Sequence, residues 1–265
     1  MINSLKCLSI IIVVILFSSC DNLASDNSTI SPLDSKIGFK VIESYDFETV
    51  STPIVFIELK SEKIYSCYNY RIVTDYKIVF NTININIIGI DKPDICLPAF
   101  GPANGRIKLG KLFGVYEIKI HGVEFDNNYN LLISDSLIII DGNETPYTNP
   151  LIHFLYRYPK NSFAYLCGTT LTDTTICKGF IDTLKSVINI TEFSFSDIAE
   201  IPYPFSSQGH YYDANARYFY YENEEEFGKI QEVMKSYKKT HFPNDDGVGL
   251  TIINWMNKKF HSWLL

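Results

Sequence analysis

The side chains most able to take part in chemistry are those of four cysteines in the body of the chain: Cys67, Cys96, Cys167 and Cys177. Cysteine sulfur can bind a metal, attack a substrate as a thiolate, or pair as a disulfide. Zinc sites combine closely spaced cysteine pairs with histidines, and this chain has neither a CxxC pair nor a histidine at ligand spacing. The choice between free thiols and disulfides then depends on the compartment in which the protein works.

The first twenty residues predict that compartment. Lys6 supplies a positive charge, and residues 8–17 form a short apolar segment that leads to two small residues, Ser18 and Ser19. This order of charge, apolar core and small residues is typical of a secretory signal peptide. A membrane-spanning helix needs about 20 apolar residues, so the segment is about half a span and we expect it to be cleaved.

The stretch from Phe17 to Cys20 resembles the lipobox of bacterial lipoproteins, although Phe17 stands where leucine is usual. In that family the cysteine thiol is diacylated and becomes the first residue of the mature protein. The resemblance implies a signal peptide over residues 1–19 and a lipid anchor on Cys20. It also implies attachment to a bacterial cell envelope, at the outer membrane rather than the inner. The alternatives are an ordinary secretory peptide cut elsewhere and an uncleaved anchor. Residues 20–37 are polar and aperiodic, which predicts a flexible tether.

An oxidising envelope compartment favours disulfides over free buried thiols, and four cysteines then predict two disulfides. Three connectivities exist for four cysteines. Sequence proximity favours Cys67 with Cys96 and Cys167 with Cys177, which places one disulfide in each half of the chain.

No catalytic or metal-binding constellation is evident in the rest of the sequence. The five histidines are scattered, and neither a Gly-x-Ser-x-Gly turn nor a glycine-rich phosphate loop is present. We therefore expect no metal, no cofactor and no enzymatic activity. The alternative is an envelope enzyme such as a glycan hydrolase. It would need two carboxylates, for which Glu200 and Asp213 are candidates, facing each other in a cleft.

One stretch has the composition of a ligand loop. Residues 201–213 combine prolines and a glycine with an aromatic set: Tyr203, Phe205, His210, Tyr211 and Tyr212. Flat aromatic faces beside hydroxyls and amides suit a sugar ring or an extended peptide, and the loop is longer than most connections within domains. The favoured alternative is that the aromatics fold inward, because 18 Tyr and 18 Phe are spread along the whole chain.

The charge balance argues against nucleic acid as a partner. The chain has 23 basic and 30 acidic residues, a formal charge of −7. Nucleic acid and anionic lipid surfaces are bound by clustered Lys and Arg. Lysines lie close together only in residues 235–239 and 258–259.

Residues 38–145 alternate between apolar and polar side chains, with turn residues every eight to twelve positions. Residues 77–87 are expected to form one strand, except for a short interruption, in which Ile83, Ile85 and Ile87 alternate with asparagines. In such a strand the apolar face is buried in the core and the polar face is exposed to solvent. Because no helical pattern interrupts the run, we predict an antiparallel β-sandwich.

Gly114-Val115-Tyr116 and the alternating residues after it resemble the strand of immunoglobulin-like domains that carries the tyrosine corner. The resemblance implies an immunoglobulin-like sandwich, and a Tyr116 hydroxyl that is bonded to nearby backbone.

Residues 146–265 mix helical and strand patterns and follow a proline-rich joint near residue 145. Apolar residues recur at helical spacing between 176 and 187, and a second helix is expected after Asn223. Glu226 follows Asn223 by three residues, which is a capping-box signature. The order β-α-β-β-α-β with one added strand predicts a small ferredoxin-like α+β domain.

These features predict a non-enzymatic envelope lipoprotein, anchored in a membrane, that acts by binding a glycan or protein partner. The alternatives to it, besides the glycan hydrolase, are a surface adhesin and an assembly subunit.

Overall fold

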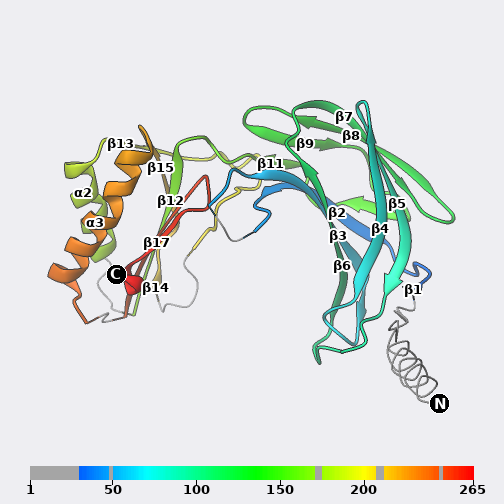
Figure 1. Ribbon diagram of the computed structural model, residues 1–265, viewed down its shortest axis with the longest axis horizontal. Helices are drawn as coiled ribbons and strands as arrows, with labels where there is room; N and C mark the ends of the chain where they lie inside the picture. Colours follow the sequence, from blue (N-terminus) through cyan, green and yellow to red (C-terminus); the bar gives the residue numbers. More distant parts are fainter. Residues whose placement is uncertain (1–29, 48–49, 171–174, 207–211, 245–246) are drawn as a thin grey trace, which may run out of the picture.

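The computed structural model describes residues 30–47, 50–170, 175–206, 212–244 and 247–265. The chain is mostly β and forms two regions, a large curled sheet followed by a small α+β region (Figure 1). This confirms the predicted order of a β-rich half and an α+β half. The predicted signal peptide, the lipidation site Cys20 and the first part of the tether lie outside the described residues.

The large sheet has eleven strands in the part of the chain that the structure describes. They are β1 (Ile30–Ser31), β2 (Ile37–Ser44), β3 (Ile54–Tyr65), β4 (Arg71–Val79), β5 (Thr82–Asp91), β6 (Gly101–Gly110), β7 (Gly114–His121), β8 (Asp126–Ile133), β9 (Leu137–Asp141), β10 (Thr148–Pro150) and β11 (Phe154–Tyr156). Their order across the sheet is β10-β2-β3-β6-β4-β5-β7-β8-β9-β11, and β1 pairs with the end of β5.

Most neighbouring strands are antiparallel, but β10–β2, β4–β6 and β5–β7 are parallel pairs. The prediction of a purely antiparallel arrangement is therefore wrong at these pairs. The reason lies in the path of the chain. After β5 the chain forms β6, which pairs with β3, and it returns as β7 in the same direction as β5. Alternation along a strand carries no information about the direction of its neighbour.

The sheet curls so that its two halves face each other across one hydrophobic core. Phe39 in β2 contacts Tyr129 in β8 edge to face, with 4.8 Å between the ring centroids. Ile83, Ile85 and Ile87 are buried in this core while the asparagines between them are not, as the alternation predicts. Each buried isoleucine contributes about 1.5–3 kcal/mol relative to an exposed one.

Residues 77–87 do not form one strand but the two sides of a hairpin. Val79 lies opposite Thr82, and Phe80 and Asn81 form the turn between them. Phe80 has a φ of 51° and its side chain is 94% exposed. Two-residue turns usually carry glycine or Asn-Gly, because positive φ is strained for other residues. The sequence shows no such signal here.

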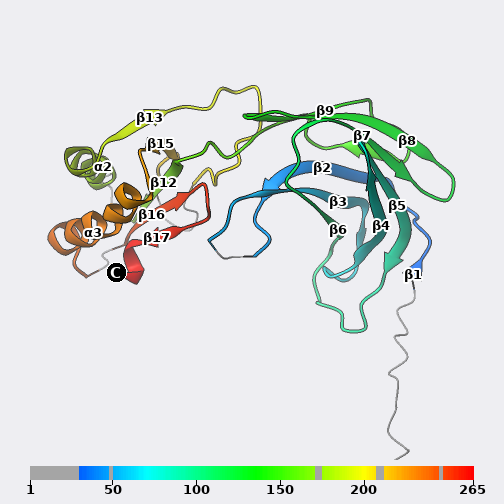
Figure 2. The ribbon, with the colours of Figure 1, turned by 45° about the horizontal axis from the view of Figure 1, so that its top comes forward.

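The α+β region contains a second sheet and two helices. Its strands are β12 (Ser162–Thr169), β13 (Ile190–Phe193), β14 (Tyr212–Asp213), β15 (Arg217–Tyr221), β16 (Val248–Asn254) and β17 (Lys259–His261), and its helices are α2 (Thr175–Val187), α3 (Glu224–His241) and the 3₁₀ helix η1 (Ser262–Leu264). The sheet order is β13-β15-β12-β16-β17, with β14 beside the end of β12. Both α-helices lie on one face of this sheet (Figure 1, Figure 2).

The central strand β12 is buried at all eight positions because both faces of the sheet are covered. Phe163, Tyr165 and Cys167 belong to the core beneath the helices. Ala164 faces the other way and packs in a small cluster with Tyr203. Strands with two covered faces show no polar alternation, which explains the continuous apolar run.

Helix α3 begins where its sequence predicts. The Asn223 side chain accepts hydrogen bonds from the backbone N–H groups of Glu225 and Glu226, at 3.1 and 3.0 Å. The prediction that Asn223 caps this helix is confirmed. A cap of this kind contributes about 1 kcal/mol.

The large sheet extends past residue 145, near which the domain boundary is predicted. β10 pairs with β2 and β11 pairs with β9. The second sheet begins only at Ser162. The change from one sheet to the other thus falls between residues 156 and 162, and the division into domains stays a prediction.

Candidate functional site

The two disulfides have the predicted connectivity. Cys67 is bonded to Cys96 in loops at one end of the large sheet, and Cys167 in β12 is bonded to Cys177 in α2. One disulfide therefore closes each region. Sulfurs held in this way are neither nucleophiles nor metal ligands.

The predicted ligand loop is described only in part. Tyr203 is buried, and its hydroxyl donates to the Ser162 carbonyl at 3.0 Å. Burial raises the pKa of Tyr203 well above its ordinary value. Phe205 is exposed. His210 and Tyr211 lie outside the described residues, and Tyr212 is placed only as a residue of β14.

A buried ion pair lies where the two regions meet. The Glu43 side chain in β2 is 3% exposed and accepts hydrogen bonds from Arg157 Nε at 2.9 Å and Nη2 at 2.7 Å. Its other oxygen accepts from the backbone N–H of Tyr158 at 3.0 Å. The pair holds the end of β2 against the connection between the two sheets.

Three tyrosines lie close to the Glu43–Arg157 pair, where the two regions meet. Tyr158 contacts Tyr45 and Tyr203, with 5.3 and 4.9 Å between the ring centroids. Burial raises the pKa of Tyr158 to about 12 and that of Tyr45 still further. The Tyr45 hydroxyl donates to the carbonyl of Trp255 at 3.0 Å. The tyrosines stay protonated at neutral pH, so they act as hydrogen-bond donors rather than as bases.

A cleft of about 570 Å³ lies over this junction. The large sheet contributes the start of β3 and the turn between β6 and β7, and the other region contributes Trp255. Small-molecule and glycan sites commonly lie in clefts of about 300–1,000 Å³ where two parts of a protein meet. The residues that could contact a ligand are Thr52, Lys111, Phe113, Asp135, Lys160 and Trp255.

The cleft presents aromatic faces beside lysines. Phe113 is 63% exposed and Trp255 is half-buried. Lys111 and Lys160 are exposed, and neither forms an ion pair with any residue that the structure describes. The Tyr116 hydroxyl donates to the carbonyl of Phe113 at 3.3 Å, which is the kind of backbone bond predicted for Tyr116 and which fixes the turn.

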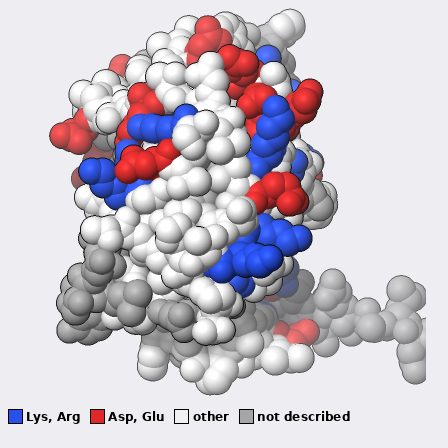
Figure 3. All heavy atoms as spheres, turned by 90° about the vertical axis from the view of Figure 1, so that its left-hand side faces the viewer, with Lys and Arg blue, Asp and Glu red and all other residues white. Residues whose placement is uncertain are grey.

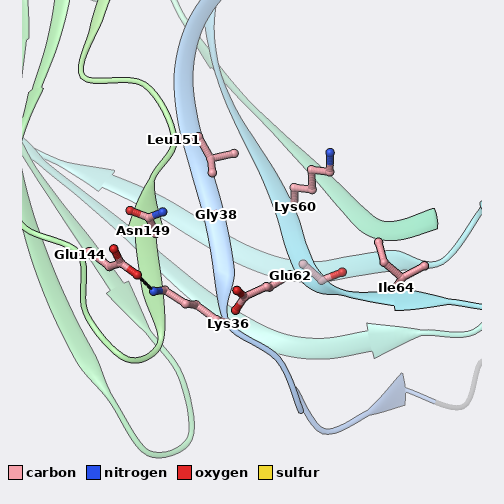
Figure 4. A pocket seen from close by; sticks show the side chains of 9 residues that line it. Lys36, Gly38, Lys60, Glu62, Ile64, Glu144, Asn149 and Leu151 are labelled. Carbon is pink, nitrogen blue, oxygen red and sulfur yellow. Dashed lines mark hydrogen bonds and ion pairs between the residues drawn. The ribbon is translucent and has the colours of Figure 1, made fainter.

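A second hollow, of about 380 Å³, lies at the sheet edge formed by β10, β2 and β3 (Figure 4). Lys36 points toward Glu144 and forms an ion pair with it. The Leu151 side chain lies over Gly38, where an added Cβ would come within 2.6 Å of it. Because its charges are compensated and it lacks exposed aromatic rings, this hollow is a weaker candidate than the cleft.

The outer end of the α+β region shows mixed charge. Acidic and basic side chains lie next to each other around an uncharged band (Figure 3). In the α+β region Arg217 forms an ion pair with Glu192, and Lys229 with Glu226. The face in view carries side chains of both signs.

The two candidate carboxylates of the hydrolase alternative are not brought together in a described cleft. Glu200 is exposed, and its backbone is bonded to that of Phe154 and Tyr156. Asp213 is placed only as a residue of β14. Within the described residues no group of three or more His, Cys, Asp or Glu could hold a metal ion.

Sequence reasoning missed the cleft and its buried pair. Glu43 and Arg157 lie 114 positions apart, and such a distance hides the pairing. One signal was present: Glu43 continues the alternating inward series of Ile37, Phe39 and Val41. An acid in an apolar inward series needs a partner, so this series indicates a buried cation elsewhere in the chain.

Comparisons with known proteins add no relative. No protein-family model, no curated protein and no solved structure matches the chain. In the ranges that the structure describes, no helix is both long enough and apolar enough to cross a membrane.

Proposed function

We propose that this protein is a non-enzymatic lipoprotein of a bacterial cell envelope, held by acyl chains on Cys20. The apolar leader and the Ser18-Ser19-Cys20 sequence that resembles a lipobox support the anchor. The two disulfides suit an oxidising compartment. Two or three acyl chains hold a protein on a bilayer almost permanently.

The function that the geometry supports best is binding of an acidic glycan in the cleft. The observation that carries it is the combination of two aromatic side chains, the exposed Phe113 and the half-buried Trp255, with two lysines that lack acid partners among the described residues. Aromatic rings stack on the apolar faces of sugar rings, and ammonium groups bind their carboxylates. The buried Glu43–Arg157 pair beneath would keep the two walls in register.

The immunoglobulin-like and ferredoxin-like assignments belong to this proposal. For the large sheet, the two facing halves and the Tyr116 bond favour an immunoglobulin-like module. For the α+β region, the strand order β16-β12-β15-β13 and its wholly antiparallel pairing favour a ferredoxin-like module with β17 added. Both are folds on which many binding functions occur.

The anchor is tested by metabolic labelling with radioactive palmitate. We expect label on the wild-type chain and none on Cys20→Ala. Equal labelling of the two chains, or none on either, would contradict the anchor without bearing on the cleft.

Binding in the cleft is tested with the full chain in detergent by following tryptophan fluorescence, to which Trp255 in the cleft contributes, during titration with tetragalacturonate and with the uncharged cellotetraose. We expect only the acidic tetrasaccharide to bind. Replacing either Lys111 or Lys160 by alanine should weaken it about tenfold, because a hydrogen bond to a charged group is worth about 1.5 kcal/mol. Lys92→Ala, which removes an exposed lysine outside the cleft, is the matched control. Equal binding of the two sugars, or equal loss in the control, would contradict the proposal.

A further inference from the structure

An exposed apolar surface lies at one end of the large sheet, away from the cleft. We name it the apolar tip, and its members are Ile64, Tyr68, Ile95, Leu97 and Phe100. Their exposed fractions range from 51% for Leu97 to 81% for Phe100. The segments that carry them, residues 64–70 and 95–105, contain no charged residue. Exposed apolar patches of this kind usually mark a surface that contacts a membrane or another protein.

The two segments of the apolar tip are joined by a disulfide and by hydrogen bonds. The disulfide is the one between Cys67 and Cys96. The backbone N–H of Tyr68 donates to the Leu97 carbonyl at 3.2 Å, and the Asn69 side chain bonds the backbone of Ile95 and Leu97 at 2.7 and 3.1 Å. Polar groups that bond one another in this way can enter an apolar medium at low cost.

The charges beside the apolar tip are partly paired and otherwise balanced, because Lys92 and Asp94, just before Ile95, are exposed side chains of opposite sign. Lys63, which precedes Ile64, forms an ion pair with Asp34. Arg71 lies 3.6 Å from Asp91. Contact through this surface would therefore depend on apolar side chains and little on the charge of the partner.

The position of the apolar tip relative to the start of the described chain decides its occupant. Ile30 pairs with Asp91 at the end of β5, directly before the loop that carries Ile95 and Phe100. Figures 1 and 2 show β1 and this end of the sheet on the same side of the molecule. Ile30 lies ten positions after Cys20, and a chain of that length spans at most about 35 Å. An anchor on Cys20 would keep the apolar tip near the bilayer.

We propose that the apolar tip inserts into the surface of the bilayer to which the chain is anchored. This inference rests on the proposed lipid anchor. Tyr68 and Phe100 would lie at the level of the lipid headgroups, where aromatic side chains are favoured. The tip would turn a flexible attachment into a defined orientation of the protein on the membrane.

The test places a tryptophan on the apolar tip of the full chain. Phe100→Trp is reconstituted into phosphatidylcholine vesicles whose acyl chains carry bromine, which quenches tryptophan only on contact. Phe80→Trp is the matched control, because Phe80 is also highly exposed but lies at the opposite end of β5. The native Trp255 and Trp263 give both variants the same background.

We expect the emission added by Phe100→Trp to be blue-shifted and largely quenched, and the emission added by Phe80→Trp to be unchanged. The same result is expected with phosphatidylglycerol vesicles, because the flanking basic and acidic residues balance each other. If the Phe100→Trp chain floats with the vesicles while its added emission stays unquenched, the contact is overturned and the anchor is left intact. A chain that does not float would refute the anchor itself, and so remove the premise of the contact.

Two further outcomes would also overturn the proposal. Equal quenching at positions 100 and 80 would mean unspecific adsorption. A blue shift of the Phe100→Trp emission that rises with protein concentration in the absence of vesicles would assign the apolar tip to a second copy of the chain.

Discussion

Glu43 is a buried charged residue, and it needs hydrogen-bond donors from its neighbours. It lies on the inward face of β2, and its two oxygens accept bonds from Arg157 and from the backbone of Tyr158. A buried carboxylate costs several kcal/mol unless such bonds replace its hydration. Its partner is therefore essential to the junction between the two regions.

We expect Arg157→Met to lower the free energy of unfolding by about 3–5 kcal/mol, because it leaves the Glu43 charge buried and unpaired. Urea unfolding at neutral pH measures the loss. Lys119→Met is the control, since Lys119 pairs with Glu117 on the surface, and exposed pairs contribute less than about 1 kcal/mol. Similar losses in the two variants would show that the Glu43–Arg157 pair contributes no more to the free energy of unfolding than a surface pair does.

For single residues, the sequence predicts those features that depend on residues nearby in the chain. The disulfide pairs follow from compartment and proximity, and the Asn223 cap follows from its distance to Glu226. The meeting of Lys111, Phe113 and Trp255 at one cleft could not be predicted, because each acquires its neighbours only when distant segments come together. The inward position of Glu43 could be predicted, but the identity of its partner could not.

At the scale of elements, strand β13 shows how a short edge strand is held. Glu192 in β13 accepts two hydrogen bonds of 2.7 Å from Arg217 in β15, and one of 3.1 Å from Lys185 in α2. The Arg217 bonds lower the pKa of Glu192 to about 2 from an ordinary 4.5, and Lys185 adds to the effect.

This lowered pKa predicts an acid-sensitive contribution to stability. The bonds stabilise the folded state fully above pH about 4.5, where Glu192 is ionised even when unfolded. They are lost as the pH falls through about 2, where the folded carboxylate takes up a proton. We expect Glu192→Gln to be less stable than wild type by under about 1 kcal/mol at pH 7, since the group is largely solvated. The difference should vanish near pH 2, as followed by urea unfolding. A stability difference that does not change with pH would contradict the lowered pKa of Glu192 as its cause.

Element boundaries and pairings differ in how well they follow from sequence. The alternation in β5 predicts its buried face correctly, yet the turn at Phe80 is missed because that turn has no glycine. The parallel pairing of β5 with β7 is missed because pairing depends on where β6 goes. Helix α3 is predicted well because its apolar spacing and its cap are both local.

At the scale of the whole molecule, the apolar tip and the cleft lie at opposite ends of one strand. Ile54 at the start of β3 lines the cleft, and Ile64 near its end belongs to the apolar tip. Twelve residues of strand span at most about 40 Å. An anchored chain that contacts the bilayer with the apolar tip would hold the cleft well away from the lipid.

The two native tryptophans test this orientation without any substitution. Trp255 lines the cleft, and Trp263 belongs to η1 in the α+β region, which lies at the far end of the long axis from β1 (Figure 1). In vesicles with brominated acyl chains, the wild-type chain is therefore expected to keep its full tryptophan emission. Quenching by acrylamide from the water should be the same with and without vesicles, because both residues stay in solvent. Loss of native emission to brominated lipid would mean that the molecule lies flat on the bilayer, with its cleft against the membrane.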